Sequence, residues 1–353
     1  MAQFASLIGP HGLTLLTLAG VWALIAALGH RKRMVLVPVV LLGAAGLLYL
    51  GNGQVASKLL YMAMHHGQYG QKVVRLIQTN APQNQKWDPD MIPVFFDRNL
   101  GFTAAEGKQK PDVIIWPETS VPYLLNRAED ALHVISLAAG GVPVVLGMQR
   151  RGENNQYYNS LVVLDADGAV GEVYDKSHLV PFGEYVPGGR LAAALGLNGF
   201  AAQEGFGFGS GDGLRLVDIP GLGRALPLIC YEAIFPEEVG GVMPRPDWLL
   251  QITNDAWFGN LTGPQQHLAQ ARFRAIEQGL PMVRAANTGI SAMIDARGQI
   301  TAMLPLGVAG FLDADLPPRL PATPYSRTGD WPVELLLIAA AALLLLKRRT
   351  VTG

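Results

Sequence analysis

The chain has 353 residues, of which half are hydrophobic and 16% are charged, with 27 basic and 28 acidic side chains. This balance provides no global field that would attract nucleic acid, so no nucleic-acid partner is expected. The single cysteine excludes an internal disulfide and leaves two interpretations of the thiol, a small buried hydrophobe or a nucleophile. Ordinary soluble domains carry about a quarter of charged residues, so the low share here indicates membrane contact if the apolar residues are clustered.

The apolar residues are clustered first near the N-terminus. Residues 12–29 and 34–50 are two uncharged runs, each long enough to cross a hydrocarbon core. The basic turn "HRKR" at 30–33 joins them, so residues 1–56 are predicted to form a membrane hairpin. The alternatives are a buried helix pair of a soluble domain and a signal peptide. A signal peptide is disfavoured because the basic residues follow the first run.

A third apolar run, residues 333–346, precedes the basic residues 347–349 and predicts a transmembrane helix within 332–353. The positive-inside rule places both basic clusters, 31–33 and 347–349, in the cytoplasm and the long segment between them on the other side. This topology leaves Met1 outside. It therefore predicts an odd number of further helices upstream.

The extramembrane segment, residues 73–316, is predicted to be one α/β domain flanked by linkers at 57–72 and 317–331. Short apolar runs alternate with helical stretches, as in α/β folds. Turn sequences at 165–168 and 295–298 indicate hairpins and therefore a mixed sheet. Strands are predicted within residues 72–80, 111–118, 142–150, 157–168, 224–232, 247–255, 281–289 and 291–298, and helices at 89–101, 127–139, 233–240 and 263–279.

Three chemically distinct side chains each end or follow a predicted strand: Glu118, Lys176 and Cys230. Taken singly, each could have no catalytic role, as a solvated charge in a loop or as a buried thiol. Together they suit acyl transfer, because a thiol needs a base and the resulting oxyanion needs a fixed positive charge. His267 lies on a predicted helix and is interpreted as structural. No cluster has metal-ligand spacing, so no metal and no cofactor are expected.

The stretches "WPET", "YDKSHLVPFGEY", "CYEAIFPE" and "NDAWFG" resemble the nitrilase (carbon–nitrogen hydrolase) superfamily and, within it, the apolipoprotein N-acyltransferase family. The resemblance implies a nitrilase-like four-layer α-β-β-α sandwich attached to two N-terminal transmembrane helices and one C-terminal helix. It places this domain on the periplasmic side of a bacterial inner membrane. The family has a larger N-terminal membrane domain, so this chain is expected to lack the first several helices.

The resemblance also implies roles for individual residues. Glu118 would be the general base, Lys176 the oxyanion partner and Cys230 the acyl carrier. Glu232 either orders Lys176 or is a loop charge. The other residues singled out are the supporting Glu184 and Tyr231, the aromatic Trp87 near the substrate entrance, and Phe206 and Phe208 of a Gly-rich loop, predicted to be mobile, that is expected to contact substrate.

The expected reaction moves a fatty acyl chain from a membrane phospholipid to the thiol, releasing a lysophospholipid. The amine of an apolipoprotein's diacylglyceryl-cysteine then takes the chain as an amide. The alternatives are a membrane-tethered amidase or nitrilase, with water in place of the amine, and an inactive truncated remnant.

Overall fold

The computed structural model describes the chain except residues 66–71, 154, 188–206, 260 and 352–353. Within these described residues, twelve strands form two sheets. The first contains β1 (Val73–Gln78), β2 (Val113–Ile115), β3 (Val144–Arg151), β4 (Tyr157–Leu164), β5 (Val170–Asp175) and β12 (Gly310–Asp315). The second contains β6 (Val217–Ile219), β7 (Gly223–Ile229), β8 (Trp248–Thr253), β9 (Met282–Ala286), β10 (Ser291–Ile294) and β11 (Ile300–Leu304).

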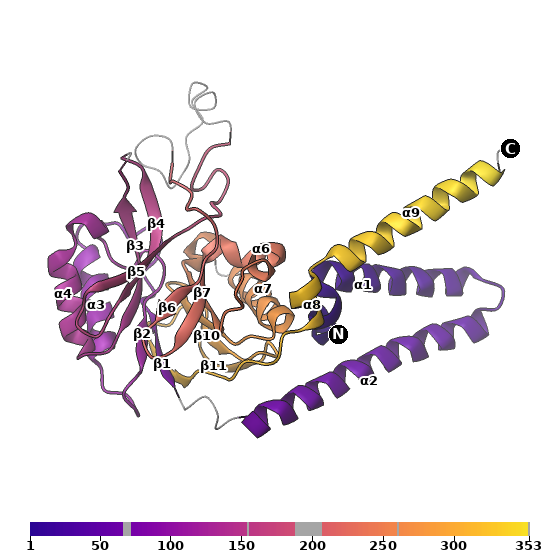
Figure 1. Cartoon of the computed structure of the whole chain (residues 1–353), viewed down its shortest axis with the longest axis horizontal. Coiled ribbons are helices and arrows are strands. Elements are labelled where there is room, and N and C mark those ends of the chain that lie inside the picture. The colour runs from indigo at the N-terminus through magenta and orange to yellow at the C-terminus, as the bar shows by residue number, and fades with distance from the viewer. Residues whose placement is uncertain (66–71, 154, 188–206, 260, 352–353) are drawn as a thin grey trace.

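The two sheets pack face to face, with the strand orders β12-β1-β2-β3-β4-β5 and β11-β10-β9-β8-β7-β6. Each sheet has two buried faces, as the alternation of side chains along β1 shows. Val74 and Leu76 enter the core between the sheets, whereas Ile77 enters the core on the outer face of the first sheet. That outer face is covered by α3 (Ile92–Ala104) and α4 (Glu129–Ala139). The second sheet is covered by α6 (Pro236–Gly240) and α7 (Gly263–Gln278) (Figure 1). The order of layers is therefore α-β-β-α.

The eight predicted strands are confirmed, and both sheets are mixed. The turns at 165–168 and 295–298 connect the antiparallel pairs β4–β5 and β10–β11, as expected. The helix predicted from residue 233 begins later, because residues Cys230–Ile234 form the 3₁₀ helix η3 before Pro236 starts α6. Strands β5, β6, β11 and β12 were not among the eight predicted ranges.

Helices α1 (Ala5–Gly29), α2 (Arg33–His65) and α9 (Trp331–Val351) project from the sandwich on one side (Figure 1). Two segments, Ala2–Gly29 and Met34–Ala63, are long and apolar enough to cross a membrane. A crossing by α9 stays a prediction. Helix α2 continues into the segment predicted as a linker, and the short helix α8 (Pro324–Thr328) lies in the second predicted linker.

A close contact joins the first apolar helix to the α/β domain. Helix α1 is kinked at Gly9, whose φ is 66°, directly before Pro10. A Cβ at Gly9 would lie 2.1 Å from a ring carbon of Tyr325, which is buried in α8. Only glycine therefore allows α1 to approach α8 so closely at this backbone conformation.

Candidate active site

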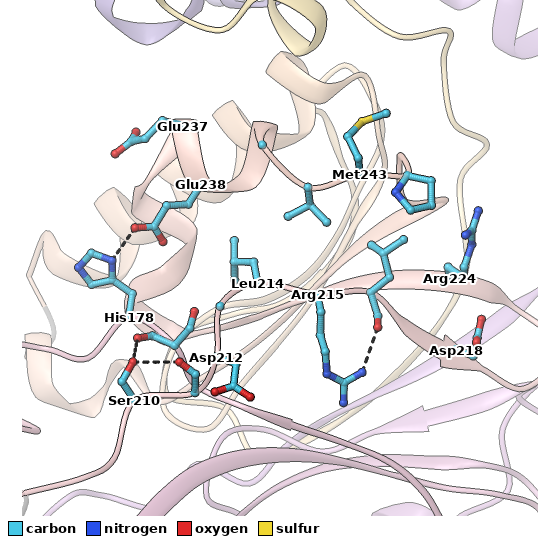
Figure 2. Close-up of a pocket in the computed structure, with 17 residues that line it drawn as sticks. His178, Ser210, Asp212, Leu214, Arg215, Asp218, Arg224, Glu237, Glu238 and Met243 are labelled. Atoms are coloured by element: carbon cyan, nitrogen blue, oxygen red, sulfur yellow. Dashed lines mark hydrogen bonds and ion pairs between the residues drawn. The ribbon is translucent and has the colours of Figure 1, made fainter.

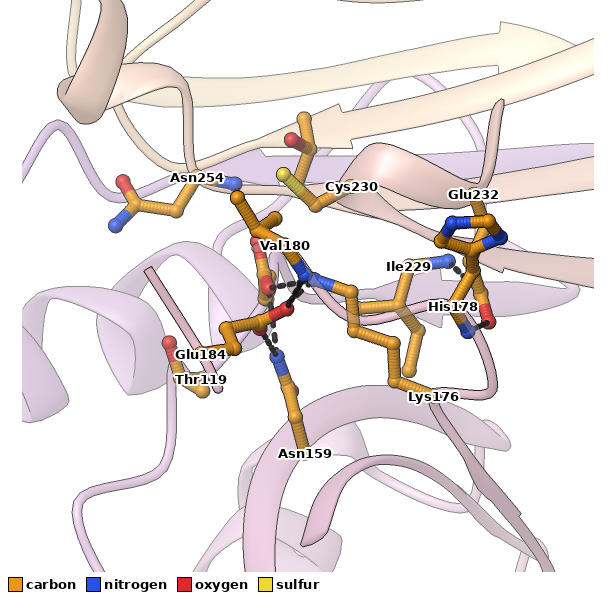
Figure 3. A network of polar contacts seen from close by, with 12 residues as sticks. Thr119, Asn159, Lys176, His178, Val180, Glu184, Ile229, Cys230, Glu232 and Asn254 are labelled. Carbon is orange, nitrogen blue, oxygen red and sulfur yellow. Dashed lines mark hydrogen bonds and ion pairs between the residues drawn. The ribbon is translucent and has the colours of Figure 1, made fainter. Parts of the chain in front are cut away.

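The predicted residues Glu118, Lys176 and Cys230 lie together. Lys176 and Cys230 are seen close to each other in Figure 3, and Glu118 Oε1 is 3.8 Å from Lys176 Nζ. Glu118 and Lys176 follow β2 and β5 of the first sheet, and Cys230 follows β7 of the second. All three side chains are buried. The sandwich thus brings three segments that are more than fifty residues apart in the sequence into one polar site inside an apolar core.

Lys176 lies between two carboxylates. Its Nζ donates to Glu184 Oε1 at 2.8 Å and is 3.8 Å from Glu118 Oε1. Burial opposes the charge of Lys176, but the charges of Glu118, Cys230 and Glu184 outweigh it and raise the pKa of Lys176. Lys176 is therefore a permanent cation at neutral pH.

Glu118 is held through both carboxylate oxygens. The side chain of Asn159 donates to Oε1 at 2.7 Å, and the backbone N–H of Asn254 donates to Oε2 at 2.8 Å. Asn159 comes from β4 and Asn254 directly follows β8, so both sheets fix this carboxylate. The two donors therefore fix the position of both oxygens of this carboxylate.

The backbone of Glu118 is also fixed. The buried ammonium of Lys86 donates to the Glu118 carbonyl at 3.2 Å and to Thr119 Oγ1 at 2.7 Å. Thr119 has a φ of 45°, which is unfavourable for a β-branched residue. On the other side, a Cβ at Gly147 would lie 2.6 Å from the Glu118 Cα. The turn that carries Glu118 therefore packs between β3 on one side and Lys86 on the other.

Lys86 is a second lysine of the site. Burial lowers its pKa to about 8, although the charges of Glu118 and Cys230 act in the opposite direction. At neutral pH it is still mostly protonated, so the site holds two ammonium groups near the thiol.

Cys230 occupies a strained position at the end of β7. Its φ is 52°, and a non-glycine residue adopts this left-handed conformation only when its surroundings hold it there. The side chain is 7% exposed. Burial and the charge of Glu118 raise the pKa of the Cys230 thiol to about 12, even though the charge of Lys176 lowers it. The resting thiol is therefore protonated and needs a base in order to react.

Glu232 is fully buried and joins the segment that carries Lys176 to the segment that carries Cys230. Its carboxylate accepts hydrogen bonds from the backbone N–H groups of Ile229 at 2.7 Å and Ser177 at 2.6 Å. The Tyr174 hydroxyl donates to it at 2.6 Å. Burial raises the pKa of Glu232 despite these donors. These contacts contradict the loop-charge interpretation, and they show that Glu232 holds the residue after Lys176 rather than the ammonium itself.

The predicted aromatic residues lie in different surroundings. Tyr231 packs edge-on against His178 and Phe235, with ring centroids 5.5 and 5.1 Å apart. Trp87 is 41% exposed, and its ring lies 5.4 Å from the Lys86 ammonium. The backbone N–H of Phe208 donates to the Glu184 carbonyl at 2.9 Å. Phe206 lies outside the described residues.

Asn159, Asn254 and Lys86 were not predicted as site residues. Asn159 interrupts an apolar run that becomes β4, and such a polar residue in a buried strand needs a partner. Asn254 stood in the quoted stretch "NDAWFG" without a role, and Lys86 directly precedes Trp87. In all three cases the signal was a polar residue inside or beside a segment that the sequence had already singled out. Its partner could not be read from the sequence.

Two cavities lie beside the site rather than over it. One of about 810 Å³ is lined by residues that include Ser177, His178, Arg215 and Glu238 (Figure 2). It meets the site only through the segment after Lys176. The other, of about 1200 Å³, is lined by residues of α2, β11 and β12. Cys230 lines neither cavity. Within the part of the chain that the structure describes, no group of three His, Cys, Asp or Glu side chains could hold a metal ion.

Comparison with known proteins relates the site to a family. Residues 56–325 match the family model "Carbon-nitrogen hydrolase". The chain is 42% identical to an apolipoprotein N-acyltransferase of Bradyrhizobium diazoefficiens over 357 residues, and this match covers 96% of the chain and 65% of the relative. A relative of the same description from Rhodopseudomonas palustris is 39% identical, with the same two shares. The chain thus spans less than two thirds of the length of these relatives.

Solved structures share the sandwich. A carbon-nitrogen hydrolase from Helicobacter pylori has a TM-score of 0.54 and 18% identity, over 70% of this chain and 90% of that one. An amidase from Nesterenkonia sp. AN1, solved in complex with butyramide, has a TM-score of 0.54 and 19% identity, over 76% of this chain and 97% of that one. At these identities the likeness extends to the fold alone.

Proposed function

Because the chain belongs to the carbon–nitrogen hydrolase family, we propose that it transfers a fatty acyl group through a thioester on Cys230. The acyl donor is a membrane phospholipid, and the acceptor is the N-terminal amine of the diacylglyceryl-cysteine of an apolipoprotein. The observation that carries the proposal is the similarity to apolipoprotein N-acyltransferases over 96% of the chain, since it includes the apolar hairpin as well as the catalytic domain.

In the first half of the reaction, Glu118 accepts the proton of the Cys230 thiol as the sulfur attacks the ester carbonyl of the phospholipid. The negative charge that develops on the carbonyl oxygen is stabilised by the Lys176 ammonium. When the tetrahedral intermediate collapses, the carbon–oxygen bond breaks. The lysophospholipid leaves with the proton that Glu118 held, and the acyl group remains on the sulfur as a thioester.

In the second half, the neutral amine attacks the thioester carbonyl and Glu118 accepts a proton from the amine nitrogen. Lys176 again faces the oxyanion. Collapse breaks the carbon–sulfur bond, and the thiolate recovers the proton from Glu118. The products are an amide and the free thiol, so the cycle needs no metal, nucleotide or oxidant.

The supporting carboxylates have separate roles in this proposal. Glu184 fixes the Lys176 ammonium through the 2.8 Å contact, which leaves the remaining protons of Nζ for the oxyanion. Glu232 fixes the backbone on both sides of the site. Tyr231, Trp87, Phe206 and Phe208 are proposed to contact the lipid.

The test is a two-substrate assay in vesicles, with a phospholipid whose fatty acid is isotopically labelled and a diacylglyceryl-cysteine peptide as acceptor. Label in the peptide, with loss of the free amine, supports the proposal. If the label appears only as free fatty acid, or the chain hydrolyses a small amide instead, the hydrolase alternative replaces it. If the parent protein carries no label at all, the remnant alternative is correct.

We further propose that α1, α2 and α9 all cross a bacterial inner membrane and hold the catalytic domain in the periplasm. The turn between α1 and α2 and the far end of α9 lie on the side remote from the sandwich (Figure 1). Basic residues form the turn between α1 and α2, at 30–33, and lie near the C-terminal end of α9, at 347–349. This arrangement agrees with a cytoplasmic location of both basic clusters.

In a Cys230→Ala background, His30→Cys places one thiol in the exposed turn between α1 and α2. We expect a membrane-impermeant thiol reagent to label it only after the cells are opened, because the turn faces the cytoplasm. As a control, Ala166→Cys in the exposed β4–β5 turn is expected to be labelled in intact cells. Labelling of His30→Cys but not of Ala166→Cys in intact cells would invert the topology.

A further inference from the structure

Four polar side chains form a closed hydrogen-bonded ring behind Cys230 and meet its carbonyl oxygen. They are Gln251 of β8, Asp255 of the 3₁₀ helix η4 (Asp255–Phe258), His267 of α7 and Arg284 of β9. The first, second and fourth are 0% exposed and the third is 4% exposed. The ring is therefore sealed from water, and its members come from four different elements.

The contacts run around the ring without a gap. Gln251 Nε2 donates to the Cys230 carbonyl at 3.2 Å, and Gln251 Oε1 accepts from Arg284 Nη1 at 2.5 Å. Arg284 Nη2 donates to Asp255 Oδ2 at 2.5 Å. Asp255 Oδ1 lies 2.8 Å from His267 Nδ1, and His267 Nε2 lies 3.1 Å from both Gln251 Nε2 and the Cys230 carbonyl.

One protonation state satisfies these contacts except the one between His267 Nε2 and the Cys230 carbonyl, which are then both acceptors, so that Gln251 alone donates to this carbonyl. A carboxylate can only accept, so His267 Nδ1 must carry a proton and donate to Asp255. The amide nitrogen of Gln251 has two protons, one for the Cys230 carbonyl and one for His267 Nε2, which must then be unprotonated. Burial and the charge of Arg284 lower the pKa of His267, which agrees with a neutral imidazole. Arg284 and Asp255 then balance each other in charge.

The ring contacts the backbone at Cys230, the residue with the strained conformation. Cys230 is the residue with a φ of 52°, and its carbonyl is the group that Gln251 and His267 contact. The direction of that carbonyl and the direction of the side chain depend on the same backbone dihedrals. A hydrogen bond to the carbonyl therefore also constrains the direction of the Cα–Cβ bond that carries the sulfur.

The segment that carries Asp255 also contacts Glu118, the proposed base. Asp255 directly follows Asn254, whose backbone N–H donates to Glu118 Oε2 at 2.8 Å. The Asn254 side chain is itself held, because Asn287 Nδ2 donates to its Oδ1 at 2.9 Å. Two consecutive residues thus connect the base on one side to the ring behind the thiol on the other.

We propose that the ring of Gln251, Asp255, His267 and Arg284 is a positioning device that holds the Cys230 backbone in its left-handed conformation and aims the thiol at Glu118. The inference rests on the proposed function only in taking Cys230 as the nucleophile. It assigns His267 a task that the sequence interpretation, a structural histidine, did not include. None of the four residues touches the substrate, so each acts through Cys230.

A ring that served only to stabilise the fold would behave differently. A buried ion pair is weak support for stability by itself, because desolvation offsets much of the attraction between the charges. Variants that break a purely structural ring would lower the melting temperature and change thiol reactivity no more than an equally buried pair elsewhere. The chain offers such a pair on the same helix: Arg274 and Glu277 are 2.7 Å apart, and Arg274 contacts the carbonyl of Ile234 rather than that of Cys230.

The experiment compares His267→Asn with His267→Gln. The asparagine amide lies at the depth of imidazole Nδ1 and keeps the bond to Asp255, whereas the glutamine amide lies at the depth of Nε2 and keeps the contact toward Gln251 and Cys230. Cys230 is the only cysteine, so its alkylation by iodoacetamide is read directly from the intact mass. The rate of acyl adduct formation in phospholipid vesicles is measured in parallel.

We expect His267→Asn to slow both rates by about tenfold to a hundredfold, the order that misplacement of a reacting group by an ångström causes. His267→Gln is expected to stay close to the parent, and so is the control Glu277→Gln. If His267→Asn does not fold, Gln251→Glu decides instead. It keeps the acceptor for Arg284 but replaces the donor to the Cys230 carbonyl with an oxygen, and it is expected to slow both rates as well.

Equal rates in His267→Asn, His267→Gln and Glu277→Gln, at matched melting temperatures, would overturn the proposal, as would an unchanged rate in Gln251→Glu. The two proposals can fail separately. A parent protein that forms no acyl adduct refutes the proposed function, while the alkylation rates still decide whether the ring positions the thiol.

Discussion

We expect Cys230→Ala to abolish acyl transfer and Cys230→Ser to reduce it to a trace. Burial raises the pKa of the thiol to about 12. At pH 8 such a group is almost entirely protonated, so the proton must pass to Glu118 as the sulfur attacks. A serine hydroxyl is a weaker acid and a weaker nucleophile than the thiol, and a carboxylate alone activates it poorly.

Intact-mass measurement after incubation with phospholipid vesicles checks this result. The parent is expected to gain the mass of one fatty acyl group. Hydroxylamine at neutral pH is expected to remove it, because thioesters are cleaved under these conditions. The alanine variant should gain no mass while keeping the circular dichroism of the parent. An adduct that persists in the alanine variant, or full transfer by it, would remove Cys230 from the mechanism.

Glu118→Gln is expected to lower the rate of acyl adduct formation by about 10² or more, the usual contribution of a general base. The structure adds a second reason. Both oxygens of Glu118 accept N–H bonds, from Asn159 and from Asn254, so a glutamine amide would place an NH₂ group against a donor in either orientation. The loss is therefore expected to exceed that from the missing proton acceptor alone.

Single-turnover acylation, followed by quenching and mass measurement, gives this rate without interference from the acceptor. Glu277→Gln is the matched control, because it makes the same change at a buried carboxylate that pairs with Arg274 instead of with the residues around the thiol. Normal acylation by Glu118→Gln would exclude Glu118 as the base. Slow acylation together with a melting temperature far below that of Glu277→Gln would indicate a structural role instead.

The strands that the sequence did not predict share a physical cause. Strands β5, β11 and β12 lie at the edges of their sheets and are only partly buried, so their residues form no continuous apolar run. Strand β6, Val217–Ile219, is also an edge strand and has three residues, too few for a period to be recognised. Central strands such as β8 are buried throughout and were found from their composition alone.

Pairing was a further question that composition could not answer. Strand β12 pairs with β1, from the opposite end of the domain, and this antiparallel pair is reinforced by the buried ion pair of Arg75 and Asp313 at 2.7 Å. The residues of neither strand predict that it pairs with the other. The division into two sheets of six strands depends on such long-range pairs, and it is what places the end of β7 opposite the ends of β2 and β5.

By itself, the sequence determined the apolar helices near the N-terminus, the class of the domain, and Glu118, Lys176 and Cys230 as candidate site residues, because these depend on runs, periods and motifs of neighbouring residues. The tertiary structure alone decided what holds those three in place. Lys86 against Thr119, Asn159 against Glu118, and the ring that joins Cys230 to His267, Asp255 and Arg284 are contacts between residues distant in the chain. A buried polar residue needs a partner, but the fold chooses which one.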